Sequence, residues 1–306
     1  MRNVIAKTVE SLRRFLQPLV KVMYYISGAL LFMMPIPVIL DVVFRFTLSK
    51  SVPGAIEIEE FLLCLTIFFA LAFVQWRGEH VKIDLFTKRF PQWLQDLLEV
   101  GMYSAAALFF ALMSSSLFHE GSKRLASNEI SFSLNIPIGP FRYMAAFGAA
   151  VLALAVLATL LEAIVRVLDS KRAAWLVFPL TLGIGLVLLP ALGYFPQNLE
   201  GAQAGLTGMG LLFTLIFLGM PIGFGMAIVG FAGMTVIYHG AAPALGMIGI
   251  VSYSQAASYM FTVVPMFILM GQFAYHSGIS GDLFRTGQVW LGRLPGGLAM
   301  SSVGGC

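Results

Sequence analysis

Residues 143–165 read YMAAFGAAVLALAVLATLLEAIV and contain a single charged side chain, that of Glu162. A run of about 20 mostly apolar residues is long enough to cross the hydrocarbon core of a bilayer as an α-helix. Four other runs are similar, although the second is short unless residues 56–60 form its first turn. The five predict an all-α, polytopic membrane protein; they are residues 22–44, 61–76, 97–118, 143–165 and 175–195.

The composition of the whole chain supports this fold class. Of its 306 residues, 58% are hydrophobic and 11% are charged, whereas a soluble domain has about 25% charged residues. The Lys and Arg residues lie in short segments between the apolar runs, which is typical of loops between membrane spans and not of a nucleic-acid groove. The first apolar run is too long for the core of a signal peptide, so we expect an uncleaved first span.

The basic residues also predict an orientation. The N-terminal tail, residues 77–89 and residues 166–172 together hold 12 Lys and Arg, and the loops on the opposite side hold 5. Because loops rich in Lys and Arg stay in the cytoplasm, the N-terminus is predicted to be cytoplasmic. Residues 197–203 are then predicted to be periplasmic.

The composition changes after about residue 200, where glycines become frequent. As a single helix, the 33 residues 206–238 would be about 50 Å long, more than the hydrocarbon core requires. The sequence Gly219-Met220-Pro221-Ile222-Gly223 lies in the middle of this run. A kink in one tilted helix and a break between two short helices both fit it. Interrupted helices are a feature of secondary transporters, while glycines also allow close helix packing.

The last part of the chain contains one more apolar run and one amphipathic segment. Residues 261–275 are apolar, with Pro265 near the start and Gly271 within the run. Residues 280–294 are predicted to form a short helix that lies in the membrane interface. The predicted helix breaks or kinks are therefore at Gly219, Pro221, Gly223, Pro265 and Gly271. The chain ends in small residues, so we expect that it stops within an element.

No pattern in the sequence predicts an enzyme. The motifs of nucleotide-binding loops, serine hydrolases and zinc proteases are absent. The two cysteines and four histidines have no metal-ligand spacing. We therefore expect no cofactor and identify no metal site.

Five charged residues form a candidate polar cluster at the predicted outer side. Asp41 and Arg45 are spaced i,i+4 and share a helix face. Glu57, Glu59 and Glu60 begin the second apolar segment on the same predicted side. The cluster has two interpretations, a site for docking or helix assembly and ordinary interfacial charge, and the sequence leaves both open.

Several stretches resemble a known family. Residues 41–45 (DVVFR), the acidic residues 57–60 and residues 69–84 (FALAFVQWRGEHVKID) resemble the small membrane subunit of tripartite ATP-independent periplasmic (TRAP) transporters. The most specific piece comprises Arg77, Gly78, Glu79, His80 and Asp84. The start of the large membrane subunit is resembled by residues 218–224 (LGMPIGF), 264–271 (VPMFILMG), 277–280 (SGIS) and 292–297 (GRLPGG).

The resemblance implies a domain organisation and a function. It implies a four-helix small-subunit domain (residues 1–170), a linker helix with a periplasmic loop (171–205), and the first broken helices of an elevator-type transport domain (206–306). It also implies sodium-coupled import of organic anions, such as C4-dicarboxylates, other carboxylates or sialic acids, across the bacterial inner membrane.

The implied partners are a periplasmic substrate-binding protein, membrane lipid and the remainder of the large subunit, with no nucleic acid. Because the sodium ligands are expected beyond Cys306, we expect an incomplete transport site. The alternative function is a membrane scaffold or anchor subunit that does not itself transport.

Overall fold

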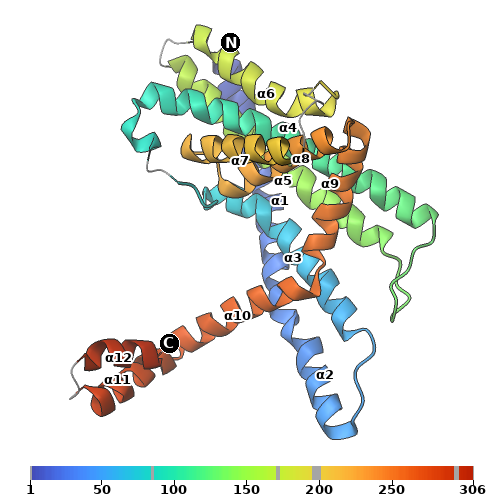
Figure 1. Cartoon of the computed structure of the whole chain (residues 1–306), viewed down its shortest axis with the longest axis vertical. Helices are drawn as coiled ribbons and strands as arrows, with labels where there is room; N and C mark the ends of the chain where they lie inside the picture. The colour runs from blue at the N-terminus through green and yellow to red at the C-terminus, as the bar shows by residue number, and fades with distance from the viewer. Residues whose placement is uncertain (1, 84–85, 170–172, 195–200, 293–295, 306) are drawn as a thin grey trace.

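The computed structural model describes residues 2–83, 86–169, 173–194, 201–292 and 296–305, and it consists of helices and their connections (Figure 1). The α-helices are α1 (Arg2–Met33), α2 (Pro35–Leu48), α3 (Ala55–Arg77), α4 (Gln92–Ala126), α5 (Gly139–Asp169), α6 (Val177–Ala191), α7 (Gly201–Phe217), α8 (Ile222–Ile237), α9 (Ala241–Ala256), α10 (Tyr259–His276), α11 (Ile279–Leu291) and α12 (Gly297–Gly305). Two short 3-10 helices, η1 (Thr87–Arg89) and η2 (Ala173–Leu176), precede α4 and α6. Within the described ranges, β pairing is limited to an isolated bridge between Ile130 and Pro137. The predicted all-α fold is confirmed.

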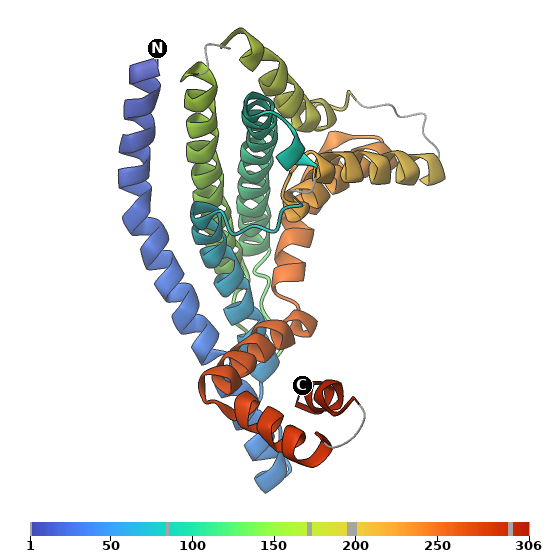
Figure 2. The same ribbon diagram turned by 90° about the vertical axis from the view of Figure 1, so that its left-hand side faces the viewer.

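Helices α1, α3, α4 and α5 form a bundle whose members run along one common direction (Figure 2). Helices α4 and α5 contact each other over most of their length, and α3 packs against both α1 and α5. Helix α5 approaches α3 closely at Gly148, where a Cβ atom would lie 2.6 Å from the Phe68 carbonyl oxygen. Small residues at such crossings allow two backbones to pack directly against each other. We call residues 2–169, which include α2, the N-terminal bundle.

Among the described residues, three helical segments are long and apolar enough to cross a membrane: Ile5–Leu48, Gln92–Ala126 and Gly139–Asp169. The bent pair α9–α10 would add a fourth if it is one broken span. The first of the three is 44 residues long, because helix α1 begins far before the predicted start of the apolar run. Leu16 and Val20 pack on α3 and α5 and are buried with Ala72 and Val151. Residues 61–76 lie in α3, whose start at Ala55 includes residues 56–60 in the helix, but α3 is not among the three segments.

The α-helix in the predicted span at residues 175–195 is shorter than predicted. Helix α6 has 15 residues, about 22 Å at 1.5 Å per residue. It ends because the chain reverses at Gly193, which has a φ of +79°. The N–H of Tyr194 donates back to the Leu189 carbonyl at 2.9 Å, which closes the helix end in the manner of a glycine C-cap.

The run at residues 206–238 is two helices, α7 and α8, so the alternative of a single kinked helix is wrong. Gly219 has a φ of +96°, a conformation that glycine adopts without the steric cost of a side chain. The Met220 N–H donates to the Leu215 carbonyl at 3.0 Å, which ends α7. Pro221 precedes α8, and its carbonyl accepts from the Gly225 N–H at 3.0 Å.

Helices α9 and α10 form a second interrupted pair, bent by 48°. The bend lies at Ala257 and Ser258, where Ser258 has an extended backbone conformation. Helix α10 runs unbroken through Pro265 and Gly271, so of the two predicted alternatives, a break or a kink, the break does not occur at either residue. A proline removes one hydrogen bond of the ladder, and the remaining bonds hold this helix together.

Beyond α10, the chain leads away from the bundle into α11 and α12 (Figure 1). Helix α11 coincides with most of the predicted interfacial segment, residues 280–294, of which residues 293–294 lie outside the described ranges. Helix α9 was not predicted from the sequence. We call residues 201–305 the C-terminal helices.

Candidate functional site

The N-terminal bundle and the C-terminal helices meet at a junction that contains most of the predicted motif residues. Its first part is the loop that follows α3. Gly78, with a φ of +67°, ends α3, and the N–H groups of Gly78 and Glu79 donate to the Gln75 and Val74 carbonyls at 3.1 Å. Arg77 pairs with Glu79 at 3.0 Å, but both side chains are exposed, and such surface pairs contribute little. The glycine therefore directs the chain toward α8.

This loop docks on the break between α7 and α8. We call residues 78–90 the junction loop; its Asp84 lies outside the described residues. The carbonyl of Val81 accepts a hydrogen bond from the Ile222 N–H at 3.1 Å, and that N–H belongs to the first turn of α8, which has no partner within its own helix. A Cβ atom at Gly219 would lie 2.8 Å from Cγ2 of Thr87. The loop thus fits closely against the break.

His80 contributes an aromatic contact to the same place. Its ring lies 4.7 Å from the ring of Phe224 in α8. Burial first, and the positive charge of Lys82 second, lower the pKa of His80 below its ordinary value of 6.5. The imidazole is therefore neutral at pH 7. Lys82 turns away and donates to the Tyr103 hydroxyl at 2.9 Å.

The second part of the junction holds α9 against α4 and α5. Arg142, in the first turn of α5, is 6% exposed, and its guanidinium lies 4.2 Å from the ring centre of Tyr253 in α9. It also faces the Gly249 carbonyl at 3.4 Å. A Cβ atom at Gly249 would lie 2.7 Å from the Ser116 carbonyl oxygen, so α9 crosses α4 in direct backbone contact. A buried arginine over an aromatic ring stabilises such a contact.

The third part joins α3 to α10 through two predicted cluster residues. Glu59 is 2% exposed, and the side chain of Thr262 lies within hydrogen-bonding reach of its carboxylate. Glu60 lies against the backbone amide of Tyr259, the first residue of α10. A carboxylate at a helix N-terminus satisfies free N–H groups and interacts favourably with the helix dipole.

The other three cluster residues act inside the bundle. Asp41 pairs with Arg45 and accepts hydrogen bonds from the Ser51 hydroxyl and the Val52 N–H, both at 2.7 Å. Glu57 accepts from the backbone amides of residues 133 and 134 in the α4–α5 loop. The members of the predicted cluster lie close enough for Asp41 and Glu60 to act electrostatically on Glu59. Their hydrogen bonds, however, go to different elements: the α2–α3 loop, the α4–α5 loop and α10.

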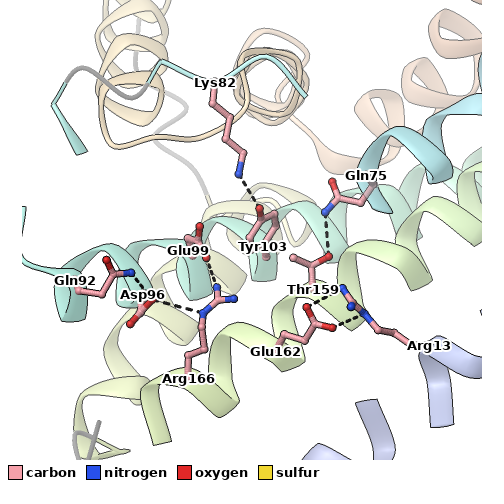
Figure 3. A network of polar contacts seen from close by, with 10 residues as sticks. All are labelled: Arg13, Gln75, Lys82, Gln92, Asp96, Glu99, Tyr103, Thr159, Glu162 and Arg166. Carbon is pink, nitrogen blue, oxygen red and sulfur yellow. Dashed lines mark hydrogen bonds and ion pairs between the residues drawn. The ribbon is translucent and has the colours of Figure 1, made fainter. Parts of the chain in front are cut away.

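A network of polar contacts at the opposite end of the bundle escaped the sequence analysis (Figure 3). Arg13 of α1 binds Glu162 of α5 at 2.9 Å, and Arg166 of α5 pairs with Glu99 and, at 3.6 Å, with Asp96 of α4. In addition, Gln75 of α3 donates to Thr159 of α5 at 3.1 Å. The signal for this network was the isolated Glu162, four residues before Arg166 on the same helix face.

The described residues include no group of three or more His, Cys, Asp or Glu side chains that could hold a metal ion. The junction residues thus hold two parts of the chain together through backbone hydrogen bonds, ring contacts and buried charges. Interrupted helices beside a bundle of long apolar helices are a feature of membrane transport proteins.

Comparison with known proteins places the chain in a family. Residues 33–166 match the family model for the DctQ component of tripartite ATP-independent periplasmic transporters, and residues 209–306 match the model for the DctM component. The chain is also 29% identical over 125 residues to the isethionate TRAP transporter permease protein DctMQ of Oleidesulfovibrio alaskensis, an alignment that covers 40% of this chain and 19% of that protein. The chain belongs to the TRAP transporter family and joins small and large membrane-subunit sequences.

The two matched ranges show which parts of the chain meet at the junction. Each of its three contacts runs from the DctQ-like region to the DctM-like region: His80 to Phe224, Arg142 to the α9 backbone, and Glu60 to Tyr259. The junction is therefore the contact between small-subunit and large-subunit sequence within one chain.

Proposed function

We propose that this chain is the membrane part of a permease that imports small organic anions, with Na⁺ as the coupling ion and a periplasmic binding protein as the donor of substrate. The observation that carries the proposal is the pair of family matches in one chain, DctQ-like and then DctM-like. The name of the family describes transporters that are tripartite, periplasmic and independent of ATP. The relative is named for isethionate, an organic sulfonate.

The proposed substrate class is small organic anions that carry a carboxylate or a sulfonate. It includes C4-dicarboxylates, other carboxylates and sialic acids, and the relative adds isethionate to these. In this proposal the N-terminal bundle is a rigid support, which fits the ion pairs of α5 with α1 and α4. The interrupted helices α7–α8 and α9–α10 belong to the part that transports.

We further propose that the chain crosses the bacterial inner membrane with its N-terminus in the cytoplasm. The excess of basic residues in the predicted inner loops supports this orientation. Figure 3 shows one basic residue from each of the three predicted inner segments in the same region: Arg13, Lys82 and Arg166. All three sit at the end of the bundle that would face the cytoplasm.

The test is an uptake assay in proteoliposomes. Residues 1–306 are carried in a complete permease of this family and supplied with its binding protein, and labelled succinate, sialic acid and isethionate are tested separately. We expect uptake of one anion class that requires both the binding protein and an inward Na⁺ gradient, and a K⁺ gradient serves as the control. Uptake that requires ATP or ignores Na⁺ would contradict the proposal. Membrane insertion without uptake of any anion under any gradient would favour the scaffold function.

A further inference from the structure

Glu59 is a buried carboxylate that lacks a cationic partner among the described residues. Its side chain is 2% exposed, and its Oε1 atom has no hydrogen-bond partner there. The other charged groups that act on it, Glu60 and Asp41, are also carboxylates. Arg45 is engaged with Asp41. Without a partner, a buried carboxyl group takes up a proton, and a positively charged hydrogen-bond donor would stabilise its ionised form.

This carboxylate lines a groove between α2, α3 and α10. The groove has a volume of about 260 Å³, and its walls include Val38, Tyr259, Thr262, Met266 and Met270. The Thr262 hydroxyl donates to the Tyr259 carbonyl at 2.7 Å, and it also lies within hydrogen-bonding reach of the Glu59 carboxylate. The groove therefore combines one acidic group with walls that are otherwise mostly apolar.

The lining identifies the class of ligand. A hard metal ion takes six or more oxygen ligands, and the described residues provide no group of acidic, His or Cys side chains that could hold a metal. A primary ammonium has three N–H donors, which suit an acceptor such as Oε1 of Glu59. The apolar walls suit an attached hydrocarbon chain, whose burial is favourable.

We propose that this groove binds an alkylammonium ion, with the ammonium group on Glu59 and the hydrocarbon chain along Met266 and Met270. The ligand then contacts α3 of the DctQ-like region and α10 of the DctM-like region, and it stabilises the outer part of the junction. Two sources share this chemistry: the amine headgroup of an aminophospholipid and a free lipophilic amine. The site does not depend on the proposed transport function.

The experiment uses the purified, delipidated 306-residue chain in detergent and native mass spectrometry. Decylamine is the probe, and decan-1-ol, which has the same chain length without the charge, is its control. We expect saturable binding of decylamine that weakens at least tenfold in Glu59→Gln. The matched control Glu10→Gln removes the same charge at an exposed position paired with Arg14, and it should bind decylamine like the unchanged protein.

A pair of phospholipids distinguishes an aminophospholipid ligand from a free amine. If the lipid is the natural ligand, phosphatidylethanolamine binds and is lost in Glu59→Gln, while phosphatidylglycerol binds equally to both proteins. If decylamine binds and phosphatidylethanolamine shows no dependence on Glu59, the ligand is a free amine. Either result supports the site.

Two results would overturn the proposal: binding of decan-1-ol as tight as that of decylamine, or unchanged decylamine binding in Glu59→Gln. The variant Met266→Trp covers the case in which Glu59→Gln does not fold, because it fills the groove and leaves the carboxylate in place. It should abolish decylamine binding, and retained binding would also refute the site.

Discussion

The crossing of α9 over α4 allows a sharp test of the junction, the substitution Gly249→Ala. The added Cβ atom would lie 2.7 Å from the Ser116 carbonyl oxygen and 2.9 Å from its carbonyl carbon. A favourable contact between heavy atoms needs about 3.5 Å, and a backbone group cannot rotate away as a side chain can. Helix α9 must therefore shift by several tenths of an ångström from the bundle. This shift would also disturb the contact of the Gly249 carbonyl with Arg142.

A second glycine in the same helix provides the control. A Cβ atom at Gly246 would meet no atom within 4 Å. Both Gly→Ala substitutions gain about 1 kcal/mol of helix propensity, and only Gly249→Ala has the cost of overpacking, about 1–3 kcal/mol. The difference in unfolding free energy between the two variants isolates that steric cost. Gly246→Ala should be as stable as the parent or slightly more stable, and Gly249→Ala should fall about 1–3 kcal/mol below Gly246→Ala.

The assay follows the reactivity of Cys64, a free thiol that is fully buried in the bundle core. Its labelling by a fluorescent maleimide during unfolding with SDS in mixed micelles reports the loss of the packed state. All proteins carry Cys306→Ser so that one thiol responds. Equal unfolding midpoints for Gly249→Ala and Gly246→Ala would show that α9 does not cross α4 in backbone contact.

Three further predictions concern other parts of the molecule. In a double-mutant cycle, Asp41→Asn should destabilise more than Arg45→Gln, because Asp41 also accepts two hydrogen bonds from the loop after α2; strictly additive effects would mean that the pair does not interact. In a protein without other reactive thiols, Asn198→Cys, which lies outside the described residues, should react with an impermeant thiol reagent in intact cells, and labelling only after lysis would reverse the proposed orientation. Because the pKa of His80 is lowered in the folded state, its contribution to stability is present above about pH 6.5 and decreases as the pH falls through that value toward the folded pKa. Measured with the Cys64 assay between about pH 5 and pH 8, the unfolding midpoint of His80→Gln should depend less on pH than that of the parent. An equal pH dependence in both proteins would exclude this role.

The bundle was predictable because its signal is local. A run of about 20 apolar residues has few stable alternatives to a helix in a bilayer, and residues 97–118 and 143–165 indeed lie within α4 and α5. The start of α1 was missed because the polar residues among positions 5–21 made the segment look like a tail. They lie on one face of the helix, and Leu16 and Val20 on the other face are buried. Helix α9 was missed because its first turns, AAPALG, are small and weakly apolar.

The breaks were harder to predict because their outcome depends on distant contacts. The sequence at residues 219–223 allowed a kinked helix or two helices. In the structure, Gly219 takes a positive φ, and the first N–H of α8 finds its acceptor at Val81, about 140 residues earlier. No local pattern contains that contact. The same holds for Arg142, which the sequence analysis counted only as a basic residue on the predicted outer side.

The two interrupted pairs share one physical requirement, a partner for the free N–H groups where the second helix begins. A break inside a membrane is tolerated where protein or water satisfies these groups. At α8 the acceptor is the Val81 carbonyl, and at α10 the Glu60 carboxylate lies against the Tyr259 amide. The Glu60 carboxylate belongs to the first turns of α3, and the Val81 carbonyl belongs to the loop that follows α3. Each places an electron-rich oxygen at a helix N-terminus, where the helix dipole favours it. Helix α3 and the loop that follows it, both in the DctQ-like region, therefore support both breaks of the DctM-like region.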